Sequence, residues 1–232
     1  MKIIAHRGGP LIAEQPLPEN SLAAIQRALD MGIKSIEIDV IAANGKLWIS
    51  HDRRLGRTIS GKGVIADLPA EYLEQQTLAN GESIPQLPKI LEMIKNKAEL
   101  NIEIKGQETI QPVIECLQSW VVEQQLDWGQ FNVSSFDHQQ LYQSMKLLPQ
   151  LRRGVLIEGI PIDYAGICRS LQAFSLNSHL GFFTKALLSD AKKHGVENWV
   201  YTVNYLDDAQ WLKGLGADAI FTDKPDLMLG LQ

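Results

Sequence analysis

Short apolar, β-branched segments alternate along the chain with segments whose apolar residues recur at helical spacing. This alternation is typical of βα units around a parallel sheet. The eight segments that we interpret as strands are Lys2 to Ala5, Ser35 to Val40, Leu100 to Ile104, Phe131 to Ser135, Gly154 to Ile157, Ala173 to Leu176, Trp199 to Val203 and Ala219 to Phe221. The clearest helical segments are Asn20 to Met31, Pro85 to Lys95, Asp137 to Leu148 and Phe183 to His194. Eight βα units without a linker predict a single (β/α)₈ TIM barrel over residues 1–232.

One segment departs from this pattern. Ala43-Asn44-Gly45-Lys46 lies between two apolar runs, and an Asn-Gly pair in that position predicts a β-hairpin, which a parallel crossover cannot contain. The second strand should therefore extend beyond the carboxyl end of the barrel, and the chain should fold back through Leu47 to His51. This places His51 near the C-terminal rim, where barrel enzymes carry their chemistry. We expect the polar, Gly-containing stretch from about 52 to 83 to be a small insertion over that rim.

Composition and charge narrow the class of protein. Hydrophobic residues at 45% and charged residues at 21% predict a soluble globular domain with a substantial core. A net charge of -5 without blocks of like charge argues against nucleic acid as a partner. We expect a cytoplasmic protein with no stable membrane insertion, because no signal peptide and no run of about 18 apolar residues is present. Cys116 and Cys168 have neither metal-ligand nor C-x-x-C spacing and are interpreted as reduced core thiols. Monomer and homodimer both remain open.

Acidic side chains recur on two of the predicted strands. Glu37 and Asp39 are two residues apart and so share one face of their strand, with apolar residues on the other face. Glu103 and Lys105 repeat this spacing on the next strand. Since the apolar face of a barrel strand meets the helices, we expect three carboxylates and one ammonium to converge in the barrel mouth.

These charges favour a metal site. Burial costs several kcal/mol per ion unless the charges are paired or bind metal. The three carboxylates exceed the positive charge of Lys105 and Arg7, and oxygen ligands suit a hard divalent cation, Mg²⁺ or Ca²⁺. The alternative is a structural lattice of ion pairs that fills the barrel centre.

Two histidines are expected beside the carboxylates. His6 follows the first strand and His51 closes the hairpin. Paired imidazoles can exchange the roles of general acid and general base near neutral pH. Arg7 and Lys105 would supply fixed positive charge to a phosphate group.

The chain resembles the glycerophosphodiester phosphodiesterase family in an ordered set of short motifs that covers nearly its whole length. The motifs are His6-Arg7-Gly8, Pro18-Glu19-Asn20-Ser21, Glu37-Ile38-Asp39-Val40, His51-Asp52, Arg57-Thr58, Gly61 and Gly63, Ile84-Pro85, Asn101-Ile102-Glu103-Ile104-Lys105, Ser135-Phe136, Thr202-Val203-Asn204 and Thr222-Asp223-Lys224-Pro225-Asp226.

The resemblance implies a TIM barrel with specific roles for these residues. It implies that the metal is held by Glu37, Asp39 and Glu103, that His6 and His51 are the catalytic acid and base, and that Arg7 and Lys105 bind the phosphate. It also implies that Glu19 and Asn20 lie near the site and that the insertion shapes the glycerol pocket. Tyr201 stands where the family usually has Trp, which changes the substrate packing expected at the rim.

The resemblance implies hydrolysis of small glycerophosphodiesters, such as glycerophosphocholine and glycerophosphoethanolamine, to sn-glycerol 3-phosphate and an alcohol, and the metal site and paired histidines expected from the residues agree with this chemistry. One alternative is a lysophospholipase D-like phosphodiesterase that acts on a lipid headgroup. Another is a metal-free binding barrel. A Schiff-base aldolase using Lys105 is a third, but the neighbouring acids favour the charged, unreactive lysine.

Overall fold

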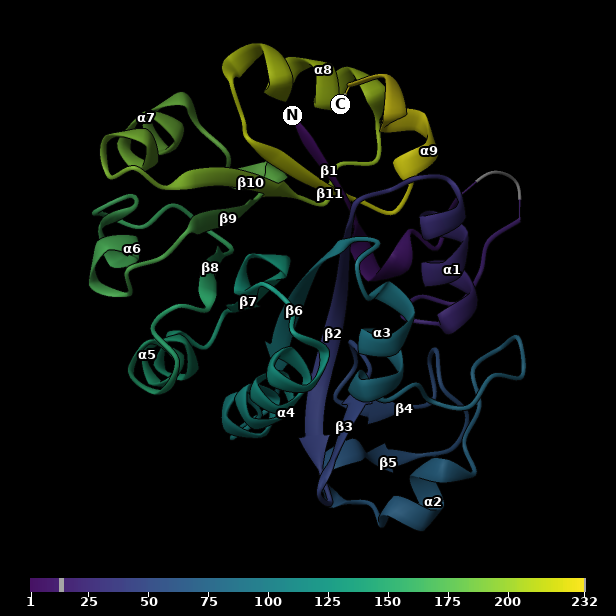
Figure 1. Ribbon diagram of the computed structural model, residues 1–232. Coiled ribbons are helices and arrows are strands. Elements are labelled where there is room, and N and C mark those ends of the chain that lie inside the picture. Colours follow the sequence, from purple (N-terminus) through teal and green to yellow (C-terminus); the bar gives the residue numbers. More distant parts are fainter. Residues whose placement is uncertain (13–14, 232) are drawn as a thin grey trace.

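The computed structural model describes residues 1–12 and 15–231, and eight parallel strands form a closed ring at its centre (Figure 1). In ring order the strands are β1 (Lys2–Ala5), β2 (Ser35–Ala43), β6 (Glu99–Lys105), β7 (Phe131–Ser135), β8 (Arg152–Ile157), β9 (Ser175–His179), β10 (Glu197–Tyr201) and β11 (Ala219–Thr222). β1 closes the ring because it pairs with both β11 and β2. The predicted TIM barrel is confirmed.

The strand boundaries differ most from expectation at β9 and β10. The predicted strand Ala173 to Leu176 is observed at Ser175–His179, and Trp199 to Val203 is observed at Glu197–Tyr201. Both observed strands contain polar residues that pair in register across the two strands, as Glu197 does with Ser175. A search for apolar runs places the boundaries of these two strands wrongly, because polar side chains fill part of this barrel's interior.

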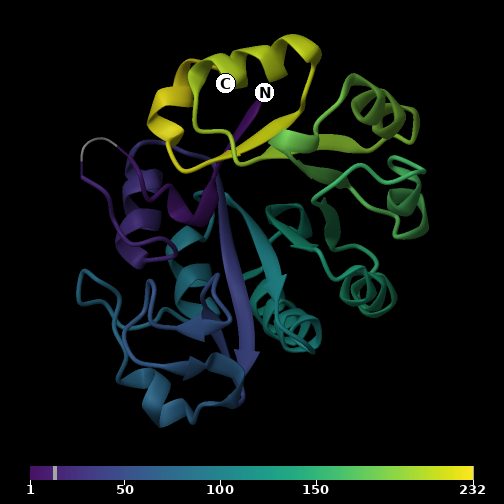
Figure 2. The ribbon, with the colours of Figure 1, turned by 180° about the vertical axis from the view of Figure 1, so that it is seen from behind.

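Helices surround the ring, as the view from behind also shows (Figure 2). They are α1 (Leu22–Asp30), α3 (Leu87–Ile94), α4 (Ile110–Gln124), α5 (His138–Leu147), α6 (Gly166–Ser170), α7 (Lys185–Lys193), α8 (Leu206–Leu215) and α9 (Pro225–Met228). The main core lies between them and the strands and contains the outward-facing Ile36, Ile38 and Val40. No helix in the described part of the chain is long and apolar enough to cross a membrane.

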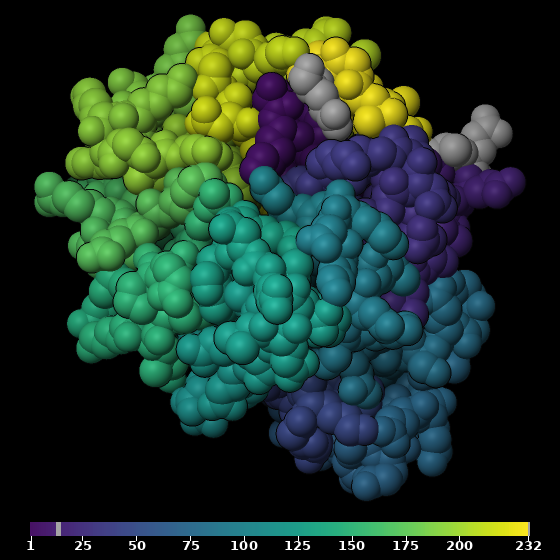
Figure 3. All heavy atoms as spheres, viewed as in Figure 1, coloured from purple at the N-terminus to yellow at the C-terminus, as the bar shows by residue number. Residues whose placement is uncertain are grey.

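The two ends of the chain meet in the barrel, because the N-terminal strand β1 pairs with the last strand, β11, and these two ends of the chain lie on the same side of the molecule (Figure 3).

The predicted hairpin is also present. β2 pairs antiparallel with β3 (Lys46–Ile49) outside the ring. Asn44 and Gly45 form the turn with φ of 52° and 72°, and a two-residue hairpin turn of this kind requires positive φ. The hairpin brings the chain back to the barrel mouth, where the Ser50 N–H donates to the Asp39 carbonyl at 3.0 Å.

The stretch 52–83 forms the expected small insertion after the second strand, but it also has an apolar core of its own, which we did not expect. It contains β4 (Arg54–Leu55), β5 (Gly63–Val64) and α2 (Ala70–Glu74), and lies beside the far ends of β2 and β3 (Figure 1). Apolar side chains scattered among the polar ones form a separate cluster against Trp48; they include Leu55, Ile59, Ile65, Leu73 and Leu78. The end of this insertion also touches the barrel, because the Glu82 carboxylate accepts from the first backbone N–H groups of α1.

Candidate active site

The turn after β1 positions two of the predicted residues. His6 and Arg7 form a short 3₁₀ turn at the carboxyl end of β1. Arg7 has φ of 51°, an uncommon value for a non-glycine residue, and its backbone N–H donates to Glu37 Oε2 at 2.8 Å. Gly9 follows with φ of 69°, and a Cβ there would lie 2.8 Å from a ring carbon of Pro225. The turn is therefore fixed on one side by Glu37 and on the other by the start of α9.

Glu37, Asp39 and Glu103 meet in the barrel mouth. One carboxylate oxygen from each lies within 4.8 Å of the others, and all three residues are buried. Among the described residues, none donates a hydrogen bond to the buried Glu37 Oε1. Three converging carboxylates, one with a free buried oxygen, match the ligands that Mg²⁺ and Ca²⁺ prefer, so the residues present fit a divalent cation.

The charge balance of this cluster points the same way. Burial and the neighbouring Asp39 charge raise the pKa of Glu37 to about 8. Burial and Asp39 also raise the pKa of Glu103. Burial opposes ionisation of Asp39 as well, but the cations of Lys105 and Arg7 outweigh it and lower its pKa. The protein's own cations thus outweigh the effects of burial at only one of the three carboxylates, Asp39, and a divalent ion would supply the missing positive charge.

Two cations flank the carboxylates. The Arg7 guanidinium lies 3.4 Å from Asp39 Oδ2 and 3.2 Å from Glu19 Oε2. Lys105 Nζ pairs with Glu103 and lies 3.4 Å from Asp39 Oδ1. Burial lowers the pKa of Lys105, but Asp39 and Glu103 together raise it above its ordinary value. Lys105 is therefore an ammonium ion, which suits phosphate binding and not Schiff-base formation.

His6 is held inside the barrel. Its Nδ1 lies 2.7 Å from Asp223 Oδ1 and its Nε2 lies 4.0 Å from Glu37 Oε2. Asp223 follows β11, and its second oxygen accepts from Asn204 Nδ2 at 2.7 Å. Burial lowers the pKa of His6, but Asp223 and Glu37 reverse this, and the net shift is upward.

His51 is held from the side of the insertion. Its Nδ1 lies 2.9 Å from Asp52 Oδ1. Arg57 donates to Asp52 through Nε at 2.5 Å and to Glu19 through Nη2 at 2.5 Å. Burial lowers the pKa of His51, and the charges of Arg7 and Lys105 contribute to the same shift.

Asn20 and Glu19 join these parts. Asn20 has φ of 61°, and its side-chain amide donates to Asp39 Oδ2 at 2.9 Å while its Oδ1 accepts from the Asp39 backbone N–H at 3.2 Å. Glu19 pairs with both Arg7 and Arg57. The segment 19–20 therefore fixes a metal-ligand candidate from the barrel and a charged residue from the insertion.

The opposite side of the mouth is aromatic. Tyr201 ends β10 and packs edge-on against Phe136 at 6.0 Å and against His179 at 5.6 Å, while its hydroxyl donates to the Ile157 carbonyl. Lys105 Nζ lies 5.8 Å from the centre of the Phe136 ring. Trp199 contacts Lys2 near the amino ends of the strands, so of the two aromatic residues on β10 it is Tyr201 that lies at the mouth.

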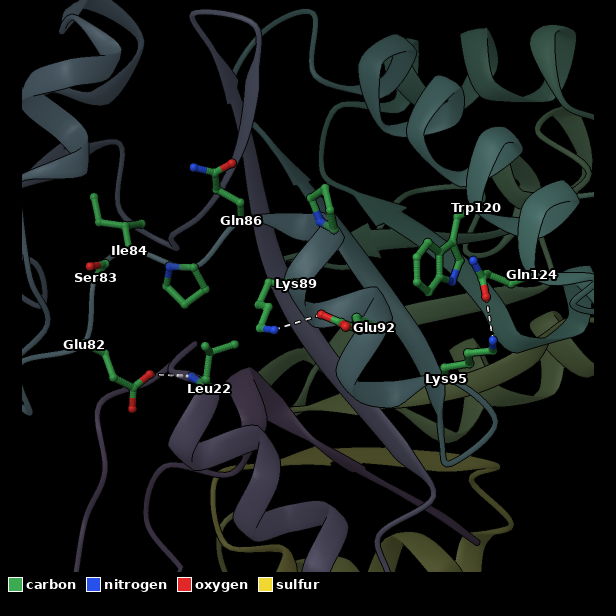
Figure 4. Close-up of a pocket in the computed structure, with 12 residues that line it drawn as sticks. Leu22, Glu82, Ser83, Ile84, Gln86, Lys89, Glu92, Lys95, Trp120 and Gln124 are labelled. Atoms are coloured by element: carbon green, nitrogen blue, oxygen red, sulfur yellow. Dashed lines mark hydrogen bonds and ion pairs between the residues drawn. The ribbon is translucent and has the colours of Figure 1, made fainter.

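A small space remains inside the mouth. It measures about 20 Å³ and is lined by His6, Glu37, Asn101, Glu103, Ser134, Leu156, Tyr201 and Phe221. A larger groove of about 1040 Å³ lies outside the barrel between α3, α4 and the end of the insertion, with Trp120 and Lys89 among its lining residues (Figure 4). None of the candidate site residues lines this groove.

The chain matches the model of the Glycerophosphoryl diester phosphodiesterase family over residues 6–227. The chain belongs to this family. It is therefore an enzyme of the phosphodiesterase class, as the sequence motifs suggested.

Individual relatives agree along the whole chain. A glycerophosphodiester phosphodiesterase of Caldanaerobacter subterraneus is 30% identical over 99% of this chain and 96% of its own. One from Bacillus altitudinis is 30% identical over 97% and 95%. The solved structure of an Oleispira antarctica phosphodiesterase, in complex with the product sn-glycerol-3-phosphate, has a TM-score of 0.88 at 30% identity and covers 99% of this chain and 96% of that one.

The structure brings the predicted residues to one end of the barrel. Seven of them form one connected set of contacts with their partners: His6, Arg7, Glu37, Asp39, His51, Glu103 and Lys105. Sequence reasoning assigned no role to Asp223, Asn204, Asp52 or Arg57. A signal existed for the first two, because each is a polar residue just beyond the carboxyl end of a predicted barrel strand.

Proposed function

We propose that this enzyme hydrolyses glycerophosphodiesters, such as glycerophosphocholine and glycerophosphoethanolamine, to sn-glycerol 3-phosphate and an alcohol, with Mg²⁺ or Ca²⁺ as cofactor. The observation that carries the proposal is the buried cluster of Glu37, Asp39 and Glu103, flanked by two histidines whose Nδ1 atoms face carboxylates. The similarity to glycerophosphodiester phosphodiesterases and the sn-glycerol-3-phosphate bound to the Oleispira enzyme support it.

The protein groups account for phosphate binding and proton transfer. When bound by the three carboxylates, the cation would supply Lewis acidity at the phosphate and at the adjacent glycerol hydroxyl. Arg7 and Lys105 hold the phosphate oxygens. One histidine takes the proton of the glycerol 2-hydroxyl as its oxygen bonds to phosphorus, and the other gives a proton to the departing alcohol oxygen as its bond to phosphorus breaks. Water then opens the resulting cyclic 1,2-phosphate with the two histidine roles reversed.

A release assay tests the proposal. The chelated enzyme is reloaded separately with Mg²⁺ and Ca²⁺ and incubated with glycerophosphocholine, glycerophosphoethanolamine and glycerophosphoglycerol. We expect sn-glycerol 3-phosphate from at least one diester with a reloaded metal. No release with any diester and either metal would contradict the proposal.

A second substrate class is favoured by the aromatic side of the mouth. Exposed apolar residues follow β7, β8 and β9 on that side: Phe136, Ile160, Ile162 and Phe182. Such a patch could contact the acyl chain of a lysophospholipid. A higher kcat/KM for lysophosphatidylcholine than for glycerophosphocholine would make the lipid the preferred substrate. The reverse order would assign the enzyme to water-soluble diesters.

Location and assembly remain predictions from the sequence. We propose a cytoplasmic enzyme that is a monomer or a homodimer. Cell fractionation tests the location, and sedimentation equilibrium of the purified chain tests the assembly.

A further inference from the structure

The contact between His6 and Asp223 belongs to a longer hydrogen-bonded chain. Asp223 Oδ1 faces His6 Nδ1 at 2.7 Å, and Asp223 Oδ2 accepts from Asn204 Nδ2 at 2.7 Å. Both oxygens of this carboxylate therefore have a fixed partner. Asn204 and Asp223 lie just beyond the carboxyl ends of β10 and β11, so the chain runs between neighbouring strand ends.

The orientation of Asn204 is set by the backbone. Its Oδ1 accepts from the backbone N–H of Asp223 at 2.8 Å and from the Thr222 hydroxyl at 3.2 Å. A backbone N–H can only donate, so Oδ1 must lie on this side and the amide NH₂ must face Asp223. This backbone donor therefore fixes the orientation of the Asn204 amide and the direction of its hydrogen bond to Asp223.

The carboxylate then determines the tautomer of His6. An ionised carboxylate only accepts hydrogen bonds, so the atom opposite Asp223 Oδ1 must be an N–H. The other ring nitrogen, Nε2, lies on the side of Glu37. A carboxylate on Nδ1 plays this part in other histidine-dependent enzymes, where replacing it with an amide gives the wrong tautomer.

We propose that Asp223, oriented by Asn204, is a positioning residue that holds His6 with hydrogen on Nδ1 and leaves Nε2 to exchange protons with the substrate. The role given to Nε2 rests on the proposed function. The position of the hydrogen on Nδ1 follows from the hydrogen bonds of Asp223 and Asn204 alone.

Exchanging the side chains of Asp223 and Asn204 tests the direction of the hydrogen bond to His6. In D223N, Asn204 still donates to position 223, so the new amide must place its oxygen toward Asn204 and its NH₂ toward His6. This donor forces hydrogen onto Nε2. In the double variant D223N/N204D, the new carboxylate at position 204 accepts from both the backbone N–H and the new amide, which turns its oxygen back toward His6 Nδ1. D223N has two amides and no carboxylate at these positions, whereas the double variant has one amide and one carboxylate, as wild type has, and so keeps the original charge.

We expect D223N to lower kcat by about 10²- to 10⁴-fold with little change in KM, because a general acid-base group contributes about that much, and we expect the double variant to recover at least tenfold of the loss. Nitrogen-15 NMR at a pH where His6 is neutral should show the Nδ1–H tautomer in wild type and in the double variant, and the Nε2–H tautomer in D223N. The His6 signals are assigned from their loss in H6Q. D207N, at an exposed position on α8, is the matched control and should keep wild-type kcat.

Three results would overturn the proposal: wild-type kcat in D223N, an unchanged His6 tautomer in D223N, or an Nε2–H tautomer in wild type. If the double variant fails to fold, judged by circular dichroism, the spectra of wild type and D223N still decide. If no diester is a substrate, the proposed function fails, while the NMR result on wild type still tests the position of the His6 hydrogen.

Discussion

His6 and His51 each face a carboxylate through Nδ1, but the two carboxylates belong to different parts of the molecule. Asp223 follows a barrel strand and is held by the half-buried Asn204. Asp52 begins the insertion and is held by Arg57, whose side chain is 53% exposed. The same chemical arrangement is therefore built once into the barrel and once onto an added segment. Changes in the insertion should affect His51 and leave His6 in place.

The largest effect is expected from removing either imidazole. H6A and H51A should each lower kcat by about 10² to 10⁴, measured as release of glycerol 3-phosphate. A diester with p-nitrophenol as leaving group separates the two histidines, because this alcohol leaves without protonation. The variant that keeps more of its activity with this diester has lost the general acid. Near-wild-type turnover of the natural diester by H51A would remove His51 from the mechanism.

A smaller effect concerns the carboxylates between the histidines. With a pKa of about 8, Glu37 is mostly protonated at pH 7 in the metal-free protein. Binding of a divalent cation should therefore release about one proton, and affinity should rise by up to about tenfold per pH unit below pH 8. Calorimetric titration with Ca²⁺ in buffers of different ionisation enthalpy measures this release. A binding enthalpy that is the same in all buffers would contradict the account of Glu37.

The raised pKa of Glu37 also determines how the stability of the metal-free protein changes with pH. Since the folded pKa of Glu37 lies above its ordinary value of 4.5, folding takes up a proton, and this contribution to the stability of the metal-free protein is lost as pH rises from about 4.5 to 8. The rise in Tm on adding metal should be larger at pH 8 than at pH 6. E37Q removes this ionisation and serves as the control.

A still smaller effect on activity is expected from removing the Arg57 side chain. R57A removes the cation that pairs with Asp52 and the link to Glu19, so we expect a loss of about tenfold in kcat. The NMR signals of His51 should shift while those of His6 stay unchanged. R57K keeps the charge but not the forked geometry and should recover part of the loss. Equal shifts of both histidines in R57A would contradict the division between barrel and insertion.

The smallest effect is expected at acid pH. Hydrogen bonds from Arg57 lower the pKa of Asp52 to about 2. A lowered folded pKa stabilises the protein above the unfolded pKa of about 3.8, and this contribution is lost as pH falls toward 2. The Tm difference between wild type and D52N should therefore shrink between pH 5 and pH 2. A difference that stays constant over this range would contradict the contact between Asp52 and Arg57.

The barrel could be predicted from sequence because its outward-facing strand residues are regularly apolar. Ile36, Ile38 and Val40 pack against the helices. Because side chains alternate along a strand, Glu37 and Asp39 then point into the barrel interior. The Asn-Gly turn similarly predicted the hairpin that returns the chain to the mouth near Asp39.

The remaining features depend on contacts between distant segments. Asp223 and His6 are 217 positions apart, and their contact exists because β1 and β11 close the ring. The apolar residues of the insertion follow no regular period, so its separate core could not be read from hydrophobic spacing. Positions 7 and 20 adopt positive φ as non-glycine residues, which composition alone does not indicate.

The most direct test of the central claim is a metal titration of the chelated enzyme, with simultaneous measurement of bound ion and of released sn-glycerol 3-phosphate. We predict that activity returns in proportion to the binding of Mg²⁺ or Ca²⁺, and that E37Q and E103Q lose binding and activity together. Full activity after chelation, or tight binding and normal activity in both variants, would contradict the claim that Glu37, Asp39 and Glu103 hold the ion on which the reaction depends.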